Sequence, residues 1–160
     1  MLGVTIICLG KLKEKYLRDA SDEYSKRLSA FCKLNIVELT PEKLSDNPSQ
    51  KEIENALQTE AKKIMEKIPK GSYIYSLCIE GKQVSSEELS AEFQNIGVGG
   101  VSNIVFIIGS SFGLSDEIKR MSNKKLSMSK MTFPHQLARI MLLEQIYRAV
   151  QISAGTKYHK

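Results

Sequence analysis

Residues 104–118 read IVFIIGSSFGLSDEI, an apolar run followed by a glycine-bounded turn and the start of a helix. The run over 104–108 is apolar at every position, which is typical of a central strand covered on both faces of a parallel sheet. The turn over 109–113, GSSFG, has the pattern G-x-S-x-G. Between a strand and a helix this pattern marks a hydrolase nucleophile elbow. The turn therefore supplies either a nucleophile, Ser111, or a backbone that holds a ligand.

Outward from this stretch, the apolar pattern alternates between the periods of strands and helices. Strands are predicted over 2–9, 34–39, 72–79, 104–108 and 125–128, and helices over 14–31, 51–68, 85–96, 114–121 and 137–152. Ser85, followed three positions later by Glu88, predicts a capping box at one helix start. The alternation predicts an α/β fold, a mostly parallel sheet with helices on both faces. The chain length predicts a single domain over 1–160.

In sheets of this kind, ligands bind outside the carboxyl ends of the strands. That rule selects three loops, EGK over 80–82, GSSFG over 109–113 and SMSKMTF over 127–133. No G-x-G-x-x-G follows the first strand, where GKLK stands at 10–13, and no Walker motif is present. The glycines of 109–113 indicate a tight turn that a ligand can approach, or one that needs a positive φ.

A nucleophilic role for Ser111 requires a nearby histidine and an acid behind it. His135 and His159 both follow Ser111 in the order that an elbow requires. Asp116, however, lies at the helix start that directly follows the turn with Ser111. It can therefore hardly sit behind a histidine that faces this serine. Beyond it stand only Glu117 and Glu144. The missing acid argues against a hydrolase, and His135 is better interpreted as a loop-orienting or packing residue.

Composition excludes several classes of protein. Cys8, Cys32 and Cys78 are an odd number without C-x-x-C spacing, which predicts free thiols in a reducing compartment. Two histidines do not make an ordinary zinc site, so no metal is expected. The apolar start has no basic region or cleavage pattern and is interpreted as a strand, not a signal peptide. No apolar stretch is long enough for a membrane span. A soluble cytoplasmic protein is expected.

Positive charge is concentrated at the C-terminal end. Residues 1–80 carry 13 Lys or Arg and 12 Asp or Glu, whereas residues 119–160 carry nine basic residues and one acid, Glu144. A basic segment of this kind indicates either a polyanionic partner such as nucleic acid or a solvated face without a partner.

The chain resembles, over its full length, the RlmH family of SPOUT-class methyltransferases. The resemblance is carried by GKLKEKY (10–16), LCIEGK (77–82), IIGSSFG (107–113), LSMSKMTFPHQLARIMLLEQIYRA (126–149) and the terminal YHK (158–160). The S-K-M-T-F-P-H-Q stretch and the YHK end are the specific parts. The resemblance implies an S-adenosylmethionine-dependent enzyme that methylates N3 of a pseudouridine in large-subunit ribosomal RNA, within the ribosome. It also implies an α/β fold with a C-terminal trefoil knot.

The resemblance further implies which residues bind and react. Cofactor contacts fall at Leu77, Gly109, Met128, Ser129, Lys130, Met131, Thr132 and Phe133. Candidates near the RNA base are His159, Tyr158 and Arg139, with His159 the titratable candidate for the general base. Candidate phosphate contacts are Lys124, Lys125, Lys130, Arg148 and Lys157. The family works as a homodimer, which would cover the last helix and bring the tail across.

One position departs from the family pattern. The family usually reads I-G-G-x-x-G, and Ser110 stands in place of the second glycine. If that position needs a positive φ, Ser110 carries a strain of about 1–3 kcal/mol, or the turn has another shape. Ser110 is also the only support for an alternative function, a non-catalytic ribosome-associated RNA-binding protein of the same fold.

Overall fold

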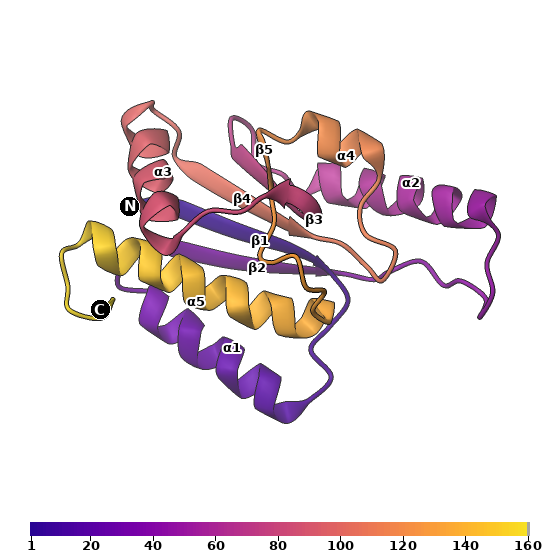
Figure 1. Cartoon of the computed structure of the whole chain (residues 1–160), viewed down its shortest axis with the longest axis horizontal. Coiled ribbons are helices and arrows are strands. Elements are labelled where there is room, and N and C mark those ends of the chain that lie inside the picture. Colours follow the sequence, from indigo (N-terminus) through magenta and orange to yellow (C-terminus); the bar gives the residue numbers. More distant parts are fainter. Residues whose placement is uncertain (160) are drawn as a thin grey trace.

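The structure, a computed structural model, describes residues 1–159 and contains five strands and five helices that alternate along the chain (Figure 1). Lys160, the last letter of the YHK end, lies outside the described residues. The elements are β1 (Gly3–Leu9), α1 (Lys15–Leu28), β2 (Lys33–Leu39), α2 (Gln50–Glu66), β3 (Tyr73–Lys82), α3 (Ser86–Val98), β4 (Asn103–Ile108), α4 (Asp116–Met121), β5 (Lys124–Leu126) and α5 (His135–Ser153).

The strands form one sheet in the order β2-β1-β4-β3-β5, and every neighbouring pair is parallel. β4 is the central strand, as its unbroken apolar run predicts. Ile104 pairs with Val4 of β1 on one side and with Tyr73 of β3 on the other. The α/β class and the parallel sheet are therefore confirmed, while the trefoil knot stays a prediction.

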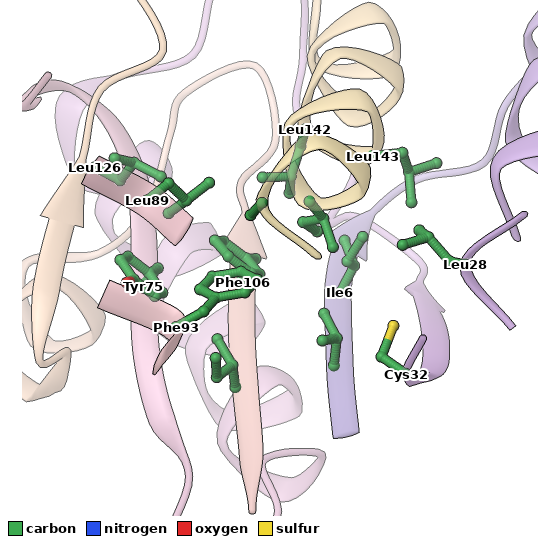
Figure 2. Close-up of a cluster of buried hydrophobic side chains, with 14 of the residues drawn as sticks. Ile6, Leu28, Cys32, Tyr75, Leu89, Phe93, Phe106, Leu126, Leu142 and Leu143 are labelled. Atoms are coloured by element: carbon green, nitrogen blue, oxygen red, sulfur yellow. The ribbon is translucent and has the colours of Figure 1, made fainter. Parts of the chain in front are cut away.

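Helices cover both faces of the sheet, because side chains of successive strand residues point to opposite faces. Ile104 and Phe106 belong to one hydrophobic cluster, together with residues of α1, α3 and α5 (Figures 1 and 2). Val105 and Ile107 belong to a second cluster with residues of α2 and α4. Figure 2 shows Leu142 of α5 among the side chains of the first cluster.

Helix starts that carry a capping box follow the predicted chemistry. The capping box of Ser85 and Glu88 is confirmed, and a second one joins Ser49 to Glu52 at the start of α2. The first helix ends at Leu28 instead of residue 31, and the last begins at His135 instead of residue 137. No helix within residues 1–159 combines the length and the apolar character that a membrane crossing demands.

The topology brings the carboxyl ends of the strands to one edge of the sheet, where the long strand β3 also holds the segment that follows β5. The Ser127 N–H donates to the Lys82 carbonyl over 3.0 Å. A Cβ at Gly81 would lie 2.7 Å from the Lys125 carbonyl carbon, so only glycine permits this close approach. The segment 127–133 is thereby fastened beside the 109–113 turn.

Candidate active site

A cavity of about 880 Å³ opens beside two of the predicted loops, 109–113 and 127–133. The third predicted loop, 80–82, is instead the end of strand β3, and it contributes Glu80 to the wall. Its wall comes from the end of β3, from the 109–113 turn and from the 127–134 segment. Seven of the eight residues expected to contact a cofactor line this cavity: Leu77, Gly109, Met128, Ser129, Met131, Thr132 and Phe133. Lys130 lies in the same segment but is not part of the wall. The volume lies in the range of small-molecule binding sites.

The 109–113 turn is closed tightly on itself. The Gly113 N–H donates to the Ser110 carbonyl over 2.8 Å, and Gly113 has a φ of +84°. A Cβ at Gly109 would lie 2.3 Å from the Gly113 carbonyl oxygen. Gly109 is therefore required by the lack of space, and Gly113 by its backbone conformation.

Ser110 fits this turn without strain. No residue other than glycine has a positive φ within the described part of the chain, so the strain considered for Ser110 is not present. Its hydroxyl donates to Glu60 Oε1 over 3.1 Å. Glu60 is only 3% exposed, and its Oε2 accepts the Glu42 N–H over 2.9 Å. The serine thus connects the turn to helix α2.

The 127–133 segment is ordered by its own serines. The buried Ser127 hydroxyl donates to the Ser129 carbonyl over 3.0 Å, and the Ser129 hydroxyl accepts the Met131 N–H over 3.0 Å. The Met131 side chain remains 75% exposed. These bonds hold the segment in one shape along the cavity and leave an apolar side chain at its mouth.

Arg139 is buried beneath the ends of β1 and β2. It is 3% exposed, and it donates to Glu38 Oε2 over 2.7 Å and to the Gly10 carbonyl over 2.9 Å. The Arg139 Nε has no hydrogen-bond partner within residues 1–159. This geometry assigns Arg139 to holding the strand ends, and its expected contact with an RNA base stays a prediction.

His135 lies one helical turn before Arg139 and lines the cavity of about 880 Å³. Burial lowers the pKa of His135, and the neighbouring charges of Arg139 and Lys13 add to this effect. The imidazole is therefore held in its neutral form near pH 7. It forms no hydrogen bond with Ser111 or with any carboxylate between residues 1 and 159, so the described residues do not assemble a hydrolase triad there.

The C-terminal tail lies along α5 and α3. Tyr158 donates its hydroxyl proton to the Glu144 carboxylate at 3.1 Å, and His159 Nε2 lies 2.6 Å from Glu87 Oε1. The hydrogen bond from His159 lowers the pKa of Glu87. None of these four residues lines the cavity of about 880 Å³. The participation of Tyr158 and His159 in the reaction stays a prediction, and it requires these two residues to reach a cavity other than the one formed by their own chain.

The five cations expected to contact phosphate differ in whether an acidic residue of the chain already pairs with them. Lys124 pairs with Glu92 and Arg148 with Glu144, each at 2.6 Å. Three of the cations are exposed and form no ion pair with any residue from 1 to 159: Lys125, Lys130 and Lys157. These three are the better candidates for an RNA contact.

Sequence reasoning missed Glu60. The helix predicted over 51–68 has its apolar stripe at Ile53, Leu57, Ala61 and Ile64, and Glu60 belongs to the same face. A carboxylate on a buried helix face needs partners, and this was the available signal. Its partners, Ser110 and the Glu42 backbone, come from other parts of the chain and could not be named in advance.

The chain matches a family of proteins described as "Predicted SPOUT methyltransferase" over residues 2–159. It is similar to proteins named "Ribosomal RNA large subunit methyltransferase H" from several clostridia. It is 55% identical to the protein of Clostridium novyi and 56% identical to that of Clostridium botulinum strain Alaska E43. Identity to the Clostridium acetobutylicum protein is 53%. Each alignment spans 159 residues, 99% of this chain and 100% of the relative.

Proposed function

Because the chain belongs to the SPOUT methyltransferase family, we propose that it transfers a methyl group from S-adenosylmethionine to large-subunit ribosomal RNA in the cytoplasm. The observation that carries this proposal is the cavity of about 880 Å³, which gathers seven of the eight expected cofactor contacts at one sheet edge. The finer proposal is that N3 of a pseudouridine accepts the methyl group within the ribosome.

The residues of this cavity suit S-adenosylmethionine. The closed turn at Gly109 leaves backbone instead of a side chain at the wall, and Leu77, Met128 and Phe133 add apolar surface. The cofactor supplies a methyl group already activated by its sulfonium. The chain therefore has to bind the donor and align it with the acceptor, and such positioning contributes roughly 7–11 kcal/mol to lowering a barrier. We propose that the hydrogen-bonded 109–113 turn and 127–133 segment provide this alignment.

The proposal includes a homodimer. Leu137 on α5 is 41% exposed, and Ile140 and Met141 of the same helix line an open groove beside it. A second copy would cover this apolar face and place its Tyr158 and His159 near the acceptor base. In that arrangement His159 is the candidate for removing the N3 proton. No metal is part of the proposal.

The direct test is transfer of radiolabelled methyl groups. Ribosomes, large subunits and protein-free ribosomal RNA from a strain that lacks the enzyme are each incubated with the protein and labelled S-adenosylmethionine. Label in the RNA supports the methyltransferase, and chromatography of the digested nucleosides identifies the position. Absence of label from all three substrates would contradict the proposed function. The alternative of a non-catalytic binding protein has lost its support, because Ser110 fits the turn without strain.

Ser111→Ala is expected to leave methyl transfer nearly unchanged. The Ser111 side chain is exposed and forms no hydrogen bond with any residue described in the structure. Turnover of the variant is compared with wild type in the same labelled assay. A fluorophosphonate probe, which labels activated serines, should leave the wild-type protein unlabelled. Loss of turnover in the variant would restore a chemical role for this hydroxyl.

Cys78 is expected to be the most reactive thiol, and S-adenosylmethionine is expected to protect it. Burial raises the pKa of Cys8 and of Cys32 to about 11. Cys78 is half-buried and lines the cavity of about 880 Å³. Alkylation by N-ethylmaleimide, followed by mass spectrometry, should therefore modify Cys78 first and more slowly with cofactor present. Equal rates with and without cofactor would place its binding elsewhere. Cys78→Ser supplies the unreactive control.

A further inference from the structure

A second cavity, of about 350 Å³, lies between the ends of β1 and β2, helix α2 and the 109–113 turn. Its wall shares Ser110, Ser111, Phe112 and His135 with the cavity of about 880 Å³. The 109–113 turn thus separates two neighbouring sites at the same edge of the sheet. The proposed function uses only one of them.

The rim of this second cavity is the loop 10–13, which begins directly after β1. The Gly10 N–H donates to the Leu39 carbonyl over 2.8 Å, and the Gly10 carbonyl accepts from the buried Arg139 over 2.9 Å. Gly10 has a φ of +116°, which favours glycine. The start of the loop is therefore held by β2 and by helix α5 at once.

The other end of the loop is held as firmly. The Lys13 N–H donates to Gln136 Oε1 over 2.8 Å. Arg18 donates to the Leu12 carbonyl over 3.2 Å and to the Lys13 carbonyl over 2.6 Å. The Leu12 side chain is buried, whereas the side chains of Lys11 and Lys13 are exposed and form no ion pair with a residue between 1 and 159. A fixed backbone thus presents two free ammonium groups at the rim.

The floor has the opposite charge. Glu60 is 3% exposed and lines the second cavity, with one carboxylate oxygen accepting from Ser110 and the other from the Glu42 N–H. A carboxylate has about four lone-pair sites, so two remain for a ligand. Phe112, whose side chain is 47% exposed, adds an aromatic ring to the wall.

We propose that this second cavity binds one unstacked nucleotide of the RNA substrate, with its phosphate on Lys11 and Lys13 and its base directed inward. The buried carboxylate repels phosphate and accepts the N–H groups of a base, which sets this direction. The Phe112 ring offers a face for stacking, as aromatic residues do in single-stranded RNA recognition. This inference rests on the proposed function and adds a second contact region for the same substrate.

The decisive comparison is between two double variants that remove the same charge. Lys11→Ala/Lys13→Ala removes the rim cations, and Lys62→Ala/Lys67→Ala removes two exposed lysines on and just after α2. The rim variant should raise the KM for the RNA substrate about tenfold and lower the slope of log affinity against log salt by about 1 for each lysine. Its kcat and its affinity for S-adenosylmethionine should stay unchanged. The α2 variant should match wild type in every quantity.

Glu60→Gln tests the floor separately. The amide keeps the size and one acceptor oxygen but replaces the other acceptor by a donor, so the KM for RNA should rise roughly tenfold. A wild-type KM and salt slope in the rim variant would overturn the proposal, as would an equal loss in the α2 variant. If wild type transfers no methyl group, the proposed function fails. The RNA affinity of the same variants, measured by fluorescence anisotropy with labelled large-subunit RNA, then still decides whether the cavity binds RNA.

Discussion

Gly109→Ala is expected to abolish detectable binding of S-adenosylmethionine and to lower methyl transfer by about 100-fold or more. The added Cβ would lie 2.3 Å from the Gly113 carbonyl oxygen, 2.6 Å from its carbon and 3.0 Å from Leu114 Cγ. Two of these atoms are backbone, so the turn has to open into the cavity beside it. Gly109→Val should have the same effect, because it adds two more carbons at the same place.

Calorimetry with S-adenosylmethionine measures the loss of binding, and thermal unfolding shows that the fold persists. Persistence is expected because the atoms nearest to the added Cβ belong to Gly113 and Leu114, and Leu114 is only one of the nine buried residues of its hydrophobic cluster. Gly97→Ala is the matched control. A Cβ at Gly97, within α3, meets no atom within 4 Å, so that variant should bind the cofactor normally and gain about 0.5–1 kcal/mol of helix stability. Normal affinity in Gly109→Ala would exclude the cavity of about 880 Å³ as the cofactor site.

Arg139→Ala is expected to lower the free energy of unfolding by about 3 kcal/mol. The variant leaves Glu38 and the Gly10 carbonyl without the guanidinium that now joins them, and it leaves a space at a position that is 3% exposed. Urea unfolding monitored by circular dichroism measures the change. Arg148→Ala, on the same helix and at a pair whose arginine side chain is 31% exposed, should cost less than about 1 kcal/mol.

The Arg139 experiment also separates two roles for this residue. If Arg139 only holds the strand ends, Arg139→Lys should recover part of the stability, because it keeps the charge but loses the fork of donors. Wild-type stability in Arg139→Ala, combined with lost methyl transfer, would instead support the contact with an RNA base that the family resemblance implies.

The central part of the fold was predictable because it depends on local patterns. The apolar run over 104–108 placed β4 in the middle of the sheet, and its neighbours β1 and β3 confirm this. Two of the three loops selected by the strand-end rule line one cavity, whereas 80–82 belongs to strand β3 and adds only Glu80. The errors lie at the boundaries of elements, where periodicity carries little information. They include strands: β3 continues to Lys82 instead of ending at residue 79, and β5 ends at Leu126 instead of residue 128.

Residue patterns along the chain determined which segments become strands and helices, because buried positions recur with the period of the strand or helix that contains them. They could not determine the partners of single charged groups. Arg139 meets Gly10 across 129 positions, Ser110 meets Glu60 across 50, and Lys124 is neutralised by Glu92. The tertiary structure decided these contacts, because a charge is paired by whatever the folded loops bring within about 3 Å of it, and the distance along the chain does not enter.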